Sequence, residues 1–154
     1  MMANHTTYRD NSSLTGPALM YQRAPLRHRR SFLFVQHKGV KQVMPHFILQ
    51  AVISSEQVCS PDTRAVGRIR IGVTASKKIG NAVARNRAKR RMRALFRLFS
   101  QIDLPHPVWQ ADYVLIARHS LVVARWDELK TDFMKAAERV HEKLLHSSTT
   151  EGRQ

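Results

Sequence analysis

The sequence has one cysteine, few acidic residues and no long hydrophobic run, and each shortage excludes a class of protein. Because Cys59 stands alone, no disulfide forms within the chain, and we expect a reducing, cytoplasmic setting. No apolar run approaches the roughly 20 residues that a membrane-spanning helix needs. Residues 1–24 are polar and lack the apolar segment of a secretory signal, so we expect a disordered N-terminal extension there.

Acidic residues are absent altogether between Asp62 and Asp103, whereas lysine and arginine recur through that segment. The whole chain has 26 Lys and Arg against 11 Asp and Glu, a formal net charge of +15. A surface that serves only solubility mixes both signs, whereas a surface that faces a polyanion excludes negative charge. The charge therefore favours a polyanionic partner: a nucleic acid, an acidic protein or an anionic membrane, of which the membrane is the weakest alternative.

Catalytic and metal-binding groups are missing as well. Nuclease sites that bind Mg²⁺ need convergent carboxylates, and the acids here fall in expected loops or on a helix of mixed charge. The eight histidines show none of the usual zinc-binding spacings. We therefore expect no catalytic side chain in this chain, and no metal or other cofactor bound by the protein alone.

The hydrophobic pattern predicts one α+β domain over residues 25–145, followed by a flexible tail over residues 146–154. Ser31 is expected to cap the first helix and Gly39 to end it. The expected order is helix, three strands, helix, strand, helix, over residues 31–38, 41–43, 46–53, 66–75, 82–99, 112–117 and 126–145. This order is typical of a small two-layer sandwich in which one face of the sheet packs on helices and the other stays accessible. The strand at residues 41–43 is expected at an edge of the sheet, and residues 54–63 are expected to form a loop. Asn81 is expected to cap the second helix, and the last helix has an apolar stripe formed by Leu129, Phe133, Ala136, Ala137, Val140 and Leu144.

The strand predicted at residues 66–75 alternates between apolar and polar positions. Ile69, Ile71 and Val73 point to one face, while Arg70 and Thr74 point to the other. We expect the first face to pack and the second to be open and cationic.

The helix that follows has one apolar stripe and cations almost everywhere else. The stripe is formed by Ala84, Ala88, Met92, Leu95 and Phe99. The opposite side carries Arg85, Asn86, Lys89, Arg90, Arg93 and Arg97, and the stripe is flanked by Arg87 and Arg91. Like charges four residues apart destabilise an isolated helix, so an external polyanion is expected to relieve them. The planar guanidinium grips phosphates and stacks on bases, which suits folded RNA.

The segment from Ser76 to Arg90, Ser-Lys-Lys-Ile-Gly-Asn-Ala-Val-Ala-Arg-Asn-Arg-Ala-Lys-Arg, resembles the signature of the bacterial ribonuclease P protein component. The similarity extends from about Leu26 to Val140. It implies an α+β sandwich with a left-handed βαβ crossover through the basic helix. It also implies a function: one such protein binds one catalytic RNA, which uses Mg²⁺ to remove the 5′ leader from precursor tRNA.

The resemblance further implies two RNA-binding surfaces. Contacts to the catalytic RNA are expected from Lys77, Arg85, Asn86, Arg87, Lys89, Arg90, Arg91, Arg93 and Arg97. Contacts to the single-stranded leader are expected from Phe32, His46, Ile48, Gln50, Arg70, Thr74 and Lys78. This chain departs from the family pattern at Gln36 and Gln50, where many members carry aromatic side chains.

Three other functions are compatible with a small basic protein. A structural ribosomal protein would share the basicity and a similar fold, but not the Arg-Asn-Arg motif with its lead-in. A stand-alone nuclease is disfavoured by the missing carboxylates. A DNA-binding protein is weaker still, because the basic helix is short and no dimerisation seam is visible.

Overall fold

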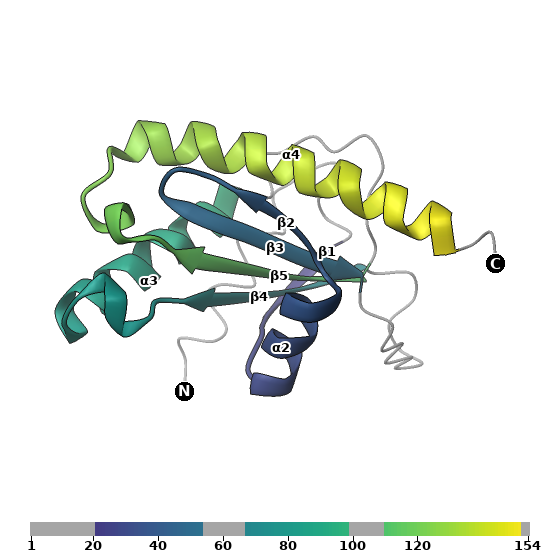
Figure 1. The fold of residues 1–154 in the computed structure, drawn as a ribbon, viewed down its shortest axis with the longest axis horizontal. Helices are drawn as coiled ribbons and strands as arrows, with labels where there is room; N and C mark the ends of the chain where they lie inside the picture. Colours follow the sequence, from purple (N-terminus) through teal and green to yellow (C-terminus); the bar gives the residue numbers. More distant parts are fainter. Residues whose placement is uncertain (1–20, 54–66, 99–109, 152–154) are drawn as a thin grey trace.

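The structure, a computed structural model, describes residues 21–53, 67–98 and 110–151. A five-stranded sheet forms its centre, and its strands are β1 (Tyr21–Pro25), β2 (Val40–Val43), β3 (Phe47–Ile53), β4 (Gly67–Thr74) and β5 (Gln110–Ala117). The helices are α2 (Arg29–Lys38), α3 (Ala82–Phe96) and α4 (Trp126–Glu151), with short 3-10 turns η3 (Lys77–Ile79) and η5 (His119–Val122). The predicted α+β class is confirmed (Figure 1).

The strands lie in the order β1-β4-β5-β3-β2. Strands β4 and β5 are parallel neighbours joined through α3, so the predicted βαβ crossover through the basic helix is present. Strand β3 pairs antiparallel with both β5 and β2. The predicted edge strand near residues 41–43 is β2, and it lies at one edge of the sheet.

The main core lies between one face of the sheet and the helices α3 and α4. Phe47 of β3 and Phe96 of α3 both pack against Phe133 of α4, with ring centroids 6.4 and 5.7 Å apart. The predicted apolar stripe of α4 is buried throughout, at Leu129, Phe133, Ala136, Ala137, Val140 and Leu144. Burial of this stripe fixes the last helix along the sheet.

A smaller core holds α2 on the opposite face of the sheet, as Figure 1 shows. Leu26 and Val35 pack there against Val114 of β5, with Phe32 at the margin. The ring of Phe32 lies directly over the backbone of Gly72, where an added Cβ would come within 2.5 Å of the ring. Glycine in β4 is therefore what allows α2 to approach the sheet.

Replacing Gly72 with Ala is expected to lower the free energy of unfolding by about 1 kcal/mol, because the new methyl group overpacks against the ring. Urea denaturation of the variant and the parent measures this. In a Phe32→Ala background the same replacement should cost much less, since the clashing ring is gone and only the Cβ of Leu26, 3.3 Å away, stays close. Equal losses in the two backgrounds would contradict the assigned contact.

Both ends of the domain differ from the sequence-based expectation. Helix α2 begins at Arg29 with His28 at the N-cap and no side-chain cap, so the prediction that Ser31 caps it is wrong. The predicted end at Gly39 is confirmed. Strand β1 lies partly within the extension that was expected to be disordered, and residues 1–20 are outside the described part.

Helix α4 continues to Glu151, so its expected end at residue 145 is wrong. The predicted loop at residues 54–63 and the side chain of Phe99 fall outside the described residues. Near the sheet edge, Lys143 of α4 donates a hydrogen bond to the backbone oxygen of Lys41 in β2 at 2.7 Å. No helix in the described ranges is long and apolar enough to span a bilayer.

Candidate nucleic-acid interface

The lead-in to the basic helix forms a tight turn that exposes two lysines. Lys77 and Lys78 lie in η3, and both are exposed to solvent. Gly80 then adopts φ +140°, a conformation that L side chains rarely occupy. The side chain of Asn81 accepts a hydrogen bond from the backbone N–H of Ala84 at 2.9 Å, which confirms the predicted cap of α3.

Helix α3 is anchored by one face and cationic on the rest. Ala88, Met92 and Leu95 are buried as predicted, and Phe96 joins them. Burial of Phe96 was not predicted, although it lies four residues after Met92 on the same side of the helix. The exposed surface gathers Asn86, Arg87, Arg90, Arg93 and Arg97, with Arg85 and Lys89 half-buried. Most of the residues expected to bind the catalytic RNA therefore share one helix surface.

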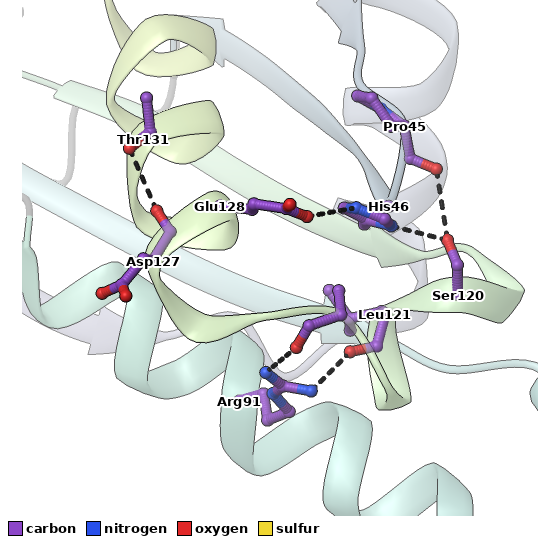
Figure 2. Close-up of polar contacts among 9 residues, drawn as sticks. Pro45, His46, Arg91, Ser120, Leu121, Asp127, Glu128 and Thr131 are labelled. Carbon is purple, nitrogen blue, oxygen red and sulfur yellow. Dashed lines mark hydrogen bonds and ion pairs between the residues drawn. The ribbon is translucent and has the colours of Figure 1, made fainter.

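Arg91 is directed into the protein. Its Nη1 atom donates to the backbone oxygens of Leu121 and Val122 at 2.9 and 2.7 Å, and its Nη2 atom donates to the oxygen of Ala124. The guanidinium also lies 6.0 Å from the ring centroid of Trp126. Figure 2 shows this side chain reaching from α3 to the turn before α4.

The surroundings of Arg91 also lower its pKa, through desolvation first and through repulsion from Arg87 second. Arg91 was predicted together with the RNA-binding residues. Because its donors are engaged by backbone carbonyls within the protein, we assign it a structural role and place it outside the candidate interface.

A groove of about 500 Å³ opens beside α2, over the face of the sheet that this helix covers and next to the end of β4. Its walls are formed by Arg27, Arg29, Phe32, Gln36, Gln50, Val73, Thr74, Ala75, Lys89, Val114 and Ile116. Three residues of the predicted leader surface, Phe32, Gln50 and Thr74, are thus brought together. We call this cavity the central groove.

Two further residues of the predicted leader surface are engaged elsewhere. Arg70 forms a bidentate ion pair with Asp112 of β5, with both N–O distances 2.7 Å. His46 lies 2.7 Å from the hydroxyl of Ser120 and 3.7 Å from the carboxylate of Glu128, at the start of α4 (Figure 2). The face carrying Arg70 is therefore not open as predicted, because α2 covers part of it and Asp112 neutralises its arginine.

The remaining two residues of that prediction, Ile48 and Lys78, do not line the central groove. Ile48 is half-buried on the same face of β3 as Gln50, and Lys78 is exposed in η3.

Two cations in the central groove, Arg27 and Arg29, were not predicted as site residues, and Lys89 was predicted only for the other surface. A signal was available for one of them. Arg29, Phe32 and Gln36 follow each other at spacings of three and four, which places them on one side of a helix. None of the described residues that line the groove is acidic. Among the residues that the structure describes, no cluster of histidine, cysteine and carboxylate side chains could hold a metal ion.

Comparison with known proteins identifies the family of the chain. A family model, Ribonuclease P, matches residues 20–141. A ribonuclease P protein component from Paramagnetospirillum magneticum is 36% identical over 115 residues, which cover 75% of this chain and 80% of that protein. Another from Ruegeria pomeroyi is 51% identical over 74 residues, which cover 47% of this chain and 57% of the relative.

Solved structures share the fold at lower identity. The ribonuclease P protein of Thermotoga maritima aligns with a TM-score of 0.59 at 23% identity, covering 77% of this chain and 98% of that structure. The protein from Staphylococcus aureus aligns with a TM-score of 0.57 at 21% identity, covering 74% and 92%. The family match, the relatives and the shared fold agree with the basic helix and its lead-in, and we conclude that the chain belongs to the ribonuclease P protein family.

Proposed function

We propose that this protein is the RNA-binding subunit of a ribonuclease P, in which it binds the catalytic RNA and the 5′ leader of precursor tRNA. The observation that carries the proposal is the state of the cations on α3. Arg85, Arg87, Lys89, Arg90 and Arg93 form no ion pair with any acid in the described part of the chain. Cations on a rigid helix without internal counterions form a surface for an external polyanion.

Binding of RNA by this surface follows from electrostatics. Each arginine or lysine that neutralises a phosphate releases condensed counterions, so affinity depends steeply on salt. The planar guanidinium binds two phosphate oxygens at once, which fixes orientation as well as charge. Because Met92 and Leu95 anchor the opposite side of α3, these cations are held at fixed spacing against a folded RNA.

The second surface is the central groove, which suits a single strand. Phe32 supplies an aromatic face for base stacking, and the cations around it attract the phosphates. Stacking of this kind tolerates any base, which fits a leader of variable sequence. The protein would thereby hold the leader while the catalytic RNA acts on the phosphodiester at its end.

The chemistry of cleavage would belong to the RNA partner. The hydrolysis uses Mg²⁺, whose preferred ligands are oxygens such as those of phosphates. The contribution of this chain is to position RNA strands and to neutralise their mutual repulsion near that site, in a 1:1 complex in the cytoplasm. A deficit of Mg²⁺ should therefore be the condition in which the protein matters most.

Reconstitution tests the proposal directly. The protein, a candidate catalytic RNA and precursor tRNA are combined at limiting Mg²⁺, and release of the leader is followed with and without protein. We expect cleavage to require the RNA and to be faster with the protein. Cleavage by the protein without RNA, or co-purification of the protein with ribosomal subunits instead of one stable RNA, would contradict this function.

Replacing Arg90 or Arg93 with Ala is expected to weaken binding to the catalytic RNA about tenfold and to reduce the slope of log K against log salt by about 0.7 to 0.9, since one phosphate contact is lost. Filter binding over a range of salt concentrations measures both quantities. Arg139→Ala, at an exposed position of α4, removes the same charge and serves as the control. The interface is wrongly assigned if both α3 variants bind like the parent protein at every salt concentration.

A further inference from the structure

Strand β1 covers only the first part of β4. Its register runs from Tyr21 opposite Gly67 to Pro25 opposite Ile71, and the backbone N–H of Leu26 makes a last bond to the oxygen of Ile71. The chain then leaves the sheet and enters α2. Among the described residues no strand pairs with the outer edge of β4 beyond Ile71, and the central groove opens along this stretch.

Three cations surround this open edge. Arg27 lies two residues after the end of β1, and Arg29 lies in the first turn of α2. Lys89 reaches the same groove from α3. Because α2 packs on one face of the sheet and α3 on the other, the groove joins the two faces around the edge of β4.

The arginines in the first turn of α2 lie where the helix dipole disfavours positive charge. The N-terminus of a helix favours negative charge. The first turn of α2 instead carries Arg29 and Arg30, contains no acid and has no side-chain cap. An anion held in the groove beside Arg29 would offset this unfavourable arrangement.

The groove also contains a polar group with unused hydrogen-bonding capacity. Gln50 is only 9% exposed and lines the groove, and its side-chain amide forms no hydrogen bond with the described residues. The side-chain amide is not fully enclosed: it opens to the groove, where a ligand can donate or accept a hydrogen bond. Its position beside Phe32 and the cations indicates a ligand with both a polar edge and negative charge.

We propose that Arg27, Arg29 and Lys89 form a phosphate clamp, through which the single-stranded leader passes from the central groove to the cationic surface of α3. A groove of about 500 Å³ has the size of a small-molecule pocket, which can hold part of a single strand. The inference rests on the proposed function. It makes the two RNA-binding surfaces one continuous path, with the clamp at the open edge of β4.

The test uses the holoenzyme reconstituted with an Arg27→Ala/Arg29→Ala double variant. Affinity is measured for precursor tRNA with a leader of about ten nucleotides, within the range that one single-strand-binding domain covers, and for the same tRNA with a one-nucleotide leader. We expect the variant to bind the long-leader substrate about tenfold more weakly, with the salt slope reduced by up to about 1.4, or 0.7 for each of two phosphates. The short-leader substrate should bind as it does with the parent protein.

Arg30→Ala is the matched control, because Arg30 is exposed in the same helical turn and does not line the groove. Circular dichroism of both variants verifies that α2 stays folded. The clamp is overturned if Arg30→Ala weakens long-leader binding as much as the double variant, or if the loss is equal for both leaders. Failure of the parent protein to assist the catalytic RNA at all would instead refute the proposed function.

Discussion

Replacing Arg70 with Met is expected to lower the free energy of unfolding by about 3 to 5 kcal/mol, the range found when one partner of a buried ion pair is removed. The side chain of Asp112 is only 3% exposed, and its Oδ1 atom lies 2.7 Å from Nε of Arg70. Without Arg70, this carboxylate stays in the interior of the sheet with much of its charge uncompensated. Urea denaturation of parent and variant measures the loss.

A second substitution separates charge from packing. If Asp112→Leu is added to Arg70→Met, the unpaired carboxylate disappears, and most of the lost stability should return. A double variant no more stable than Arg70→Met alone would show that the loss came from packing. Arg70 was predicted to bind the leader, but its guanidinium is engaged by Asp112. We therefore expect its replacement to lower RNA affinity only as far as it lowers the fraction of folded protein.

Replacing Arg91 with Met is expected to destabilise the fold by about 3 kcal/mol, because a hydrogen bond to a charged donor contributes about 1.5 to 3 kcal/mol and bonds from one side chain do not add fully. The loss should fall on the turn before α4. There the guanidinium holds the backbone oxygens of Leu121, Val122 and Ala124. Thermal and urea unfolding of the variant measure the change.

The neighbouring residue provides a control in the same helix. Arg90 is exposed, so Arg90→Met should leave stability within about 0.5 kcal/mol of the parent. The two variants should affect RNA binding in the opposite order to their effects on stability. Arg90→Met should lose affinity for the catalytic RNA, whereas folded Arg91→Met should keep it. Equal affinity losses would place Arg91 in the interface after all.

Local periodicity was sufficient for those parts of the fold in which one face of an element is buried. The stripe through Ala88 and Met92 predicted α3, and the stripe through Phe133 predicted α4. Alternation along β4 predicted the side that packs in the main core, although α2 also covers part of the other side. These elements are read correctly because burial imposes a period of 3.6 or 2 on the sequence itself.

Partners distant in the sequence were not predictable in the same way. Asp112 follows Arg70 by 42 residues and faces it only because β4 and β5 are parallel neighbours in one register. The start of α2 was missed because Ser31 is a good cap on its own. In the structure the helix begins before it, and the ring of Phe32 packs on Gly72.

In the candidate site, too, local patterns were predictable and contacts between distant residues were not. A run of cations predicts that a helix binds a polyanion, but the sequence alone does not show which cations the protein uses for itself. Arg91 and Arg90 are adjacent and chemically identical, yet one is directed to backbone carbonyls and the other to solvent. Arg27 and Arg29 become site residues only because β1 delivers them to the groove.

The hydrogen bond from Lys143 of α4 to β2 affects how the RNA-free protein associates with itself. An unprotected outer strand offers its free backbone groups to any passing copy of the same chain, which is how sheets grow into aggregates. Lys143 occupies the oxygen of Lys41 and sets a positive charge beside it. A second copy that tries to pair with β2 would meet a backbone oxygen that is already hydrogen-bonded and a positive charge beside it. The edge strand β2 therefore resists self-association.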